Sequence, residues 1–275
     1  MAILMTQTFD PFALETIAYA FADNIATVTL NRPDVRNALN RQAYRELEEV
    51  FRFIRGNGDI RCVVVTGADP AFCSGEDVKQ MMTGPERAAS QARLTSVHPE
   101  PTPAAMAVLD CERPVIAAVN GAAVGWGMEL ALFADIRIAS ERAAFGEIFI
   151  KRGLIADVGG LWRLPRIVGP EAAAELLFAG AIVKADAALR LGLVSRVVPH
   201  DRLMETAMGV ARRIAVNPLL ALRFMKEGLR RSATAELADM GSWISATLGR
   251  LFETEDHREG VASFLEKRAP NFKGR

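Results

Sequence analysis

Two buried-strand patterns that run directly into glycine-bearing turns constrain the fold of this chain more than any other feature. The run Val63-Val64-Val65 leads to Gly67, and the run Val115–Val119 leads to Asn120-Gly121. Continuous apolar runs bounded by turn residues are typical of strands that are buried on both faces of a parallel sheet. Helical patterns follow both turns, so strands and helices alternate along the chain. We therefore predict α/β architecture with parallel strand pairing.

Hydrophobic periodicity places the other elements. Tyr44, Leu47, Phe51 and Ile54 recur at helical spacing and mark the buried face of one helix. The second half of the chain is mostly helical, so we divide the chain into an α/β core at residues 1–198 and a helical region at residues 199–275. The predicted strands are Ile25–Leu30, Arg61–Thr66, Val115–Val119 and Asp135–Ala139, and the predicted helices are Arg41–Arg55, Glu171–Phe178, Ala185–Leu191, Leu203–Val216, Leu219–Arg231, Thr234–Phe252 and His257–Lys267.

Charge and cysteine content exclude several classes of function. Lys plus Arg and Asp plus Glu balance at 33 each, so broad electrostatic binding to nucleic acid or to an anionic membrane is not expected. Cys62, Cys73 and Cys111 share no metal-ligand spacing, and we predict no metal site. No apolar run approaches the roughly 20 residues of a membrane span, and residues 1–12 lack the pattern of a signal peptide. We expect a cytoplasmic protein.

Both glycine-bearing turns are candidates for holding an anion. The first contains Gly67 and Gly75, and the second contains Gly121 and Gly125. Each leads from a strand to a helix N-terminus, where backbone N–H groups lack intrahelical partners and the helix dipole is positive. Two such turns facing each other would bind an oxyanion between two donors, and loss of one donor typically raises a barrier by about 3 kcal/mol. For either turn alone, the glycines are explained equally well by tight strand–helix connections.

Five short motifs are spread along the chain. They are Asn31-Arg32-Pro33 with Arg36-Asn37-Ala38-Leu39-Asn40, then Ala71 to Asp77, Arg113 to Gly121, Leu191-Gly192-Leu193-Val194, and Glu259-Gly260 through Lys267-Arg268. In this order, over about residues 20–272, they resemble the enoyl-CoA hydratase/isomerase family, the crotonase superfamily. The resemblance implies a repeated β-β-α spiral core and a helical C-terminal region that packs subunits into trimers, which often pair into hexamers. It also implies a bent acyl-CoA substrate, a place in fatty acid metabolism, and no cofactor beyond the CoA of the substrate.

By matching position, the resemblance implies that the backbone N–H groups of Glu76 and Trp126 form the oxyanion hole. Phe264 and Lys267 resemble tail positions that approach CoA, often on a neighbouring subunit. The other residues that the resemblance places near substrate or CoA are Val35, Ser74, Gly75, Asp77, Val78 and Gly125. Met81, Met82 and the segment Ser90–Pro103, which includes His98 and looks loop-like, are expected to border the acyl pocket.

Two of these positions depart from the family's pattern. Glycine usually stands where this chain has Trp126, yet a backbone donor survives any side chain except that of proline. The indole would either narrow the acyl pocket or pack into the core. Alanine often stands where this chain has Glu76. A charge there would have to point away from the thioester or reach solvent.

The resemblance also assigns acid–base groups. Glu129 matches the first of two glutamates in the family's hydratases, and burial would raise its pKa toward neutrality. Phe149 stands where the second glutamate would be, and Glu147, two residues earlier, is the weaker substitute. Asp157 lies in a stretch similar to that of dienoyl-CoA isomerases, in which an aspartate at this position transfers a proton. A turn-stabilising aspartate is the other interpretation.

The hypothesis is therefore an enzyme that stabilises a thioester enolate and moves protons with Glu129 and Asp157. Hydration of an enoyl-CoA is the leading reaction, and enoyl- or dienoyl-CoA double-bond isomerisation is the alternative because it uses the same enolate. Asp157 also suits another CoA-thioester reaction, such as dehalogenation, in which the aspartate is the nucleophile, or ring hydrolysis. A binding protein without catalysis is the third possibility, because of Trp126 and Phe149. The acyl group itself is not predicted.

Overall fold

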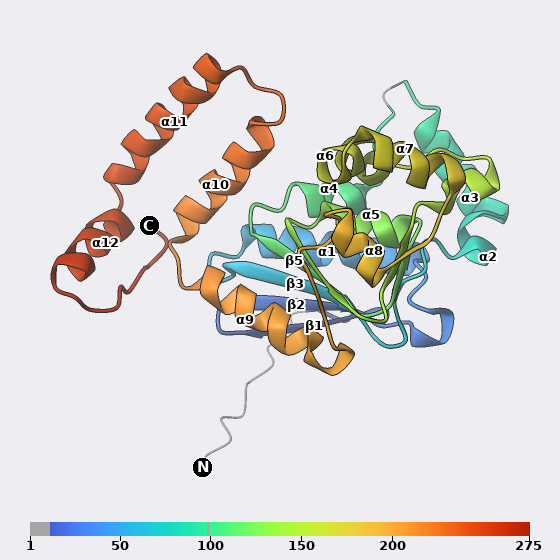
Figure 1. Cartoon of the computed structure of the whole chain (residues 1–275), viewed down its shortest axis with the longest axis horizontal. Helices are drawn as coiled ribbons and strands as arrows, with labels where there is room; N and C mark the ends of the chain where they lie inside the picture. The colour runs from blue at the N-terminus through green and yellow to red at the C-terminus, as the bar shows by residue number, and fades with distance from the viewer. Residues whose placement is uncertain (1–11, 98) are drawn as a thin grey trace, which may run out of the picture.

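The computed structural model describes residues 12–97 and 99–275, so His98 and the first eleven residues, on which the signal-peptide prediction rests, lie outside the described part. A six-stranded sheet with the order β1-β2-β3-β5-β7-β10 forms the centre of the molecule (Figure 1). Its strands are β1 (Ile17–Ala22), β2 (Ile25–Leu30), β3 (Cys62–Gly67), β5 (Val115–Val119), β7 (Ile136–Ser140) and β10 (Arg196–Val198). β1 is antiparallel to β2, and every other pairing in this sheet is parallel, as predicted.

A second sheet, with the order β4-β6-β8-β9, lies beside the first. Its strands are β4 (Ala71–Cys73), β6 (Ala122–Val124), β8 (Ala144–Gly146) and β9 (Val183–Lys184). Each of the long strands β3, β5 and β7 is followed by one of these short strands. The chain therefore winds through both sheets repeatedly, which is the spiral that the resemblance implied.

Both faces of the central sheet are buried. Side chains of a strand alternate between faces, and in β3 Val63 and Val65 belong to a different apolar cluster from Cys62 and Val64. The first cluster includes α1 (Arg41–Gly56), α4 (Pro103–Leu109) and α5 (Trp126–Phe133). The second lies against α9 (Leu203–Ala215). This double coverage explains why the strands read as unbroken apolar runs rather than as alternating patterns.

Shorter helices surround the core. They are η1 (Pro33–Val35), α2 (Val78–Met81), α3 (Gly84–Leu94), η2 (Ile148–Arg152), η3 (Gly159–Arg163), α6 (Leu164–Val168), α7 (Pro170–Ala179), α8 (Ala185–Arg190) and η4 (His200–Arg202). The prediction of a loop from Ser90 to Pro103 is wrong at its start, because α3 continues to Leu94. None of the helices in the described ranges is long and apolar enough to cross a membrane.

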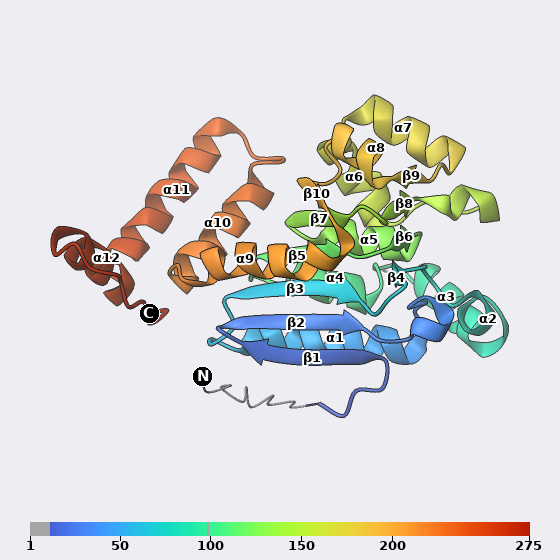
Figure 2. The same ribbon diagram turned by 60° about the horizontal axis from the view of Figure 1, so that its bottom comes forward.

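The last three helices, α10 (Leu219–Arg231), α11 (Leu237–Phe252) and α12 (Glu255–Leu265), project away from both sheets (Figures 1 and 2). Charged contacts hold α10 to the core: Lys226 Nζ lies 2.6 Å from Asp135 Oδ2, and Arg223 lies 2.6 Å from Glu112. Much of the surface of α11 and α12 remains exposed.

Candidate active site

The two glycine-bearing turns lie side by side because β4 pairs with β6 in the second sheet. Gly75 has a φ of +94°. A Cβ added to Gly75 would lie 2.8 Å from Val124 O and 3.4 Å from Trp126 N. Only glycine adopts this backbone conformation easily and leaves room for such an approach. The local sequence therefore brings the backbone of the first turn against the start of the second helix.

The backbone amides of Glu76 and Trp126 are available for a ligand. Trp126 is the first residue of α5, and the first N–H groups of a helix have no intrahelical acceptor. Within residues 12–97 and 99–275, neither amide donates to a protein acceptor. Both residues line a cavity of about 740 Å³, together with Phe149 and Asp157. This arrangement suits stabilisation of an oxyanion inside the cavity.

Among the described residues on the wall of this cavity, Asp157 and Glu76 are the two that carry a carboxyl group. The Asp157 backbone N–H donates to Glu129 Oε1 at 2.8 Å, and Asp157 Oδ1 accepts from Val158 N at 2.8 Å. The second bond joins neighbouring residues, whereas the bond by which an aspartate stabilises an Asx turn reaches two residues on. It orients the carboxylate that borders the cavity.

Glu129 is fully buried behind Asp157 and is not among the residues that line the cavity. Its carboxylate also accepts from Gly160 N at 3.0 and 3.1 Å. A Cβ on Gly159 would lie 2.0 Å from Glu129 Oε2, so this glycine is needed for the carboxylate to fit. Burial, aided by the charge of Asp157, raises the pKa of Glu129 to about 8, against the lowering effect of the backbone N–H groups.

Glu147 is a second buried carboxyl beside Glu129. It is 1% exposed, and among the described residues neither of its oxygens has a hydrogen-bond partner. Burial, with the charges of Glu129 and Asp157, raises its pKa to about 10. A Cβ on Gly160 would lie 3.2 Å from both Glu129 Oε1 and Glu147 Cδ, so these two groups are at most twice that distance apart. Sequence spacing alone does not reveal that the Glu147 carboxyl is buried next to Glu129.

Comparison with known proteins agrees with this geometry. The family model for enoyl-CoA hydratase/isomerase matches residues 20–275. The chain belongs to the enoyl-CoA hydratase/isomerase family. A short-chain-enoyl-CoA hydratase of Clostridium acetobutylicum is 36% identical, over 89% of this chain and 92% of that protein. A 1,2-epoxyphenylacetyl-CoA isomerase of Escherichia coli is 35% identical, over 95% of this chain and all of that protein. A crystal structure of an enoyl-CoA hydratase from Bacillus anthracis superposes with a TM-score of 0.87 at 33% identity, covering 95% of this chain and 100% of that one.

The two residues that depart from the family's pattern both border the cavity. The Trp126 indole is 5% exposed and packs edge-on against Tyr44 and Phe133, at ring-centroid distances of 5.0 and 5.8 Å. The indole therefore both packs into the core and borders the proposed acyl pocket. The Glu76 side chain is half-buried, and its Oε1 accepts from the Tyr44 hydroxyl at 3.5 Å.

The positions expected near CoA fall into two groups. Ser74, Gly75, Val78 and Gly125 line the cavity. Val35 lies next to them, because the Ser74 hydroxyl donates to Val35 O at 3.3 Å, and Asp77 caps α2 and pairs with Arg32 at 3.2 Å. Phe264 and Lys267 lie at and just beyond the end of α12, on the opposite side of the molecule from α2 (Figure 2). Within one subunit, the structure does not bring these two residues to the cavity.

Proposed function

We propose that this protein hydrates a 2-enoyl-CoA, with the thioester oxygen bound by the Glu76 and Trp126 amides. The observation that carries the proposal is that both unpartnered amides and the Asp157 carboxylate border one cavity. The relatives named as enoyl-CoA hydratases support the choice of substrate class and reaction. No cofactor is required in this scheme, because the amides supply the electrophilic contact that polarises the thioester.

In this mechanism Asp157 accepts a proton from the attacking water while oxygen bonds to the β-carbon. The electron pair of the double bond moves onto the thioester as an enolate, which the two amides stabilise. Glu129 acts through Asp157: its carboxyl holds the Asp157 and Gly160 amides and so positions the Gly-rich turn. The enolate is then protonated at the α-carbon to give the 3-hydroxyacyl-CoA.

Double-bond migration is the second candidate, and one observation favours it. Phe149 lines the cavity, whereas Glu129 and Glu147 do not, so the described part of the wall has no second hydratase glutamate. Migration needs a proton to leave one carbon and return to another, with no bound water. The relative named as 1,2-epoxyphenylacetyl-CoA isomerase is consistent with such chemistry on this scaffold.

A substrate panel separates the reactions. Purified protein is incubated with crotonyl-CoA, a 3-enoyl-CoA and a 3,5-dienoyl-CoA, and products are identified by mass spectrometry and NMR. Water addition to crotonyl-CoA supports the first proposal, and bond migration alone supports the second. A covalent acyl or aryl adduct on Asp157 would reject both in favour of nucleophilic chemistry. Tight binding of all three compounds without turnover would indicate a binding protein.

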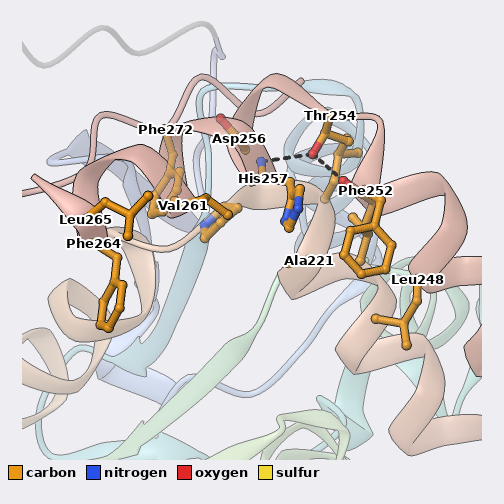
Figure 3. Close-up of a pocket in the computed structure, with 14 residues that line it drawn as sticks. Ala221, Leu248, Phe252, Thr254, Asp256, His257, Val261, Phe264, Leu265 and Phe272 are labelled. Atoms are coloured by element: carbon orange, nitrogen blue, oxygen red, sulfur yellow. Dashed lines mark hydrogen bonds between the residues drawn. The ribbon is translucent and has the colours of Figure 1, made fainter.

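We also propose that the protein forms a homotrimer through α10–α12, with trimers pairing into hexamers. An apolar pocket of about 560 Å³ opens between these helices (Figure 3). Around it, Phe252 is 62%, Phe264 82% and Leu265 73% exposed. So much exposed aromatic and aliphatic surface in one place is typical of a protein interface. A second copy of the chain is the occupant we propose, because the family's tail packs subunits together.

A cytoplasmic setting also remains our proposal. The chain's three cysteines, Cys62, Cys73 and Cys111, are all buried free thiols. Reduced thiols are the rule in the cytosol.

A further inference from the structure

The side chain of Glu76 occupies the cavity wall that Asp157 also lines. Its orientation is determined by α1, because the hydroxyl of the buried Tyr44 donates to Glu76 Oε1 at 3.5 Å. Tyr44 in turn packs against the Trp126 ring. Tyr44 therefore contacts both the Glu76 carboxyl and the Trp126 ring, next to the two amides of the proposed oxyanion hole.

Burial of the Glu76 carboxyl favours its protonated form. Burial is the main cause that raises its pKa, and the negative charge of Asp157 adds to it. The Tyr44 hydrogen bond and the positive charges of Arg93 and Arg152 act in the opposite direction, but the pKa remains above its usual value. A glutamate that keeps its proton avoids repulsion with an enolate and can donate that proton.

Both candidate reactions need one proton to be accepted and one to be returned elsewhere on the acyl chain, by the same group or by a second one. Among the described residues that line the cavity, only Glu76 and Asp157 have carboxyl groups, and none is a histidine. Glu129 and Glu147 are buried behind the wall, and Phe149 has no titratable group. Besides Asp157, Glu76 is therefore the carboxyl residue on the described cavity wall that is placed to serve as a second proton-transfer group.

We infer that the side chain of Glu76 is a catalytic residue, which donates a proton to the enolate that its own backbone amide stabilises. This inference rests on the proposed function. In hydration, Asp157 takes a proton from water, oxygen bonds to the β-carbon, and the Glu76 O–H bond breaks as the proton bonds to the α-carbon. In isomerisation, Asp157 takes the α-proton and Glu76 protonates the γ-carbon. Exchange with water then reprotonates Glu76 and deprotonates Asp157.

The test uses Glu76→Gln and Glu76→Ala, which both keep the backbone N–H, with Glu49→Gln on the exposed face of α1 as the matched control. Loss of a general acid should lower kcat by about a hundredfold in both variants, with KM changed less than threefold. Wild-type kcat should fall as pH rises through the pKa of Glu76, and this alkaline limb should be absent from the Glu76→Gln profile. Circular dichroism and thermal unfolding confirm that the variants are folded. Variants that are folded and retain wild-type kcat would overturn the inference.

A second measurement does not depend on turnover. Acetoacetyl-CoA ionises to an enolate that absorbs ultraviolet light, so its pH midpoint when bound reports on charge near the thioester. This titration is read above the pKa of Glu76, where the side chain has lost the proton that it uses in catalysis and its charge opposes a neighbouring enolate. Glu76→Gln should therefore lower this midpoint by roughly one pH unit, and Glu49→Gln should leave it unchanged. If the wild-type protein fails on every enoyl-CoA, the proposed function fails, yet this titration still decides whether Glu76 faces the thioester. An unchanged midpoint in Glu76→Gln shows that it does not.

Discussion

Asp157 is the residue whose replacement should reduce turnover most, and Glu129 should act through it. Asp157→Asn keeps an oxygen for Val158 N but cannot accept a proton, so kcat should fall by about a hundredfold or more. Glu129→Gln should also reduce kcat by about a hundredfold, because it alters the contacts with the Asp157 and Gly160 amides. Since both act on one step, the double variant should be little slower than Asp157→Asn alone.

The measurement is kcat for the two single variants and the double variant, with acyl-CoA affinity determined by calorimetry. Affinity should change little, which separates lost proton transfer from lost binding. Multiplicative losses in the double variant would mean that Glu129 contributes independently of Asp157. Unchanged turnover in Glu129→Gln would remove Glu129 from the mechanism.

Glu147 makes the stability of the fold depend on pH. An unfolded glutamate has a pKa near 4.3, whereas burial raises the folded value to about 10. The folded state therefore binds more protons between these values, so its contribution is fully present below pH 4.3 and is lost as pH rises toward 10. Glu147→Gln cannot ionise, so its free energy of unfolding should fall less steeply from pH 6 to pH 9. Urea titrations at both pH values test this, and a slope equal to that of wild type or Glu49→Gln would contradict it.

For single residues, the sequence predicts which backbone positions form the site better than it predicts what their side chains contact. The Glu76, Trp126 and Asp157 positions were matched by motif, and the structure brings all three to one cavity. The direction of the Glu76 side chain does not follow from the local sequence, because it depends on Tyr44, which lies 32 residues earlier in the chain. The buried state of Glu147 also arises from tertiary packing that no local spacing encodes.

The element that matters most to the site is α5, whose first turn presents the Trp126 amide. A Cβ on Gly127 would lie 2.0 Å from the backbone O of Cys73 in β4. Gly127→Ala should therefore push α5 away from the first turn, lower stability by about 1–3 kcal/mol and reduce kcat. Gly209→Ala in α9 is the matched control, because its nearest atom is the end of the Arg213 side chain at 3.9 Å.

Chemical unfolding and steady-state kinetics of the two alanine variants give the comparison. Alanine at position 209 should stabilise the protein by about 0.5–1 kcal/mol, since it replaces a helical glycine. Equal stability of the two variants would show that the close contact between α5 and β4 is unimportant.

Several long elements follow from hydrophobic periodicity, whereas the strand β1, the helix α3 and the short strands do not. Ile25–Leu30, Val115–Val119 and Leu219–Arg231 coincide with β2, β5 and α10. The three-residue strands β4, β6 and β8 carry too few residues for a periodic pattern, and they form because the spiral brings them together. Since β4 and β6 align the two turns, the part of the fold that builds the site was the part least visible in hydrophobic periodicity.

At the scale of the whole molecule, α10–α12 should complete the assembly. Phe264 is 82% exposed on α12 and borders the apolar pocket (Figure 3). In a trimer, an aspartate there would be an unpaired buried charge, which strongly opposes association. Phe264→Asp should therefore shift the molecular mass measured by light scattering from trimer or hexamer to monomer. Phe178→Asp on α7, where the phenylalanine is 80% exposed, should not yield monomers. A monomeric wild-type protein, or a Phe264→Asp variant of unchanged mass, would mean that these helices cover something other than a second copy of the chain.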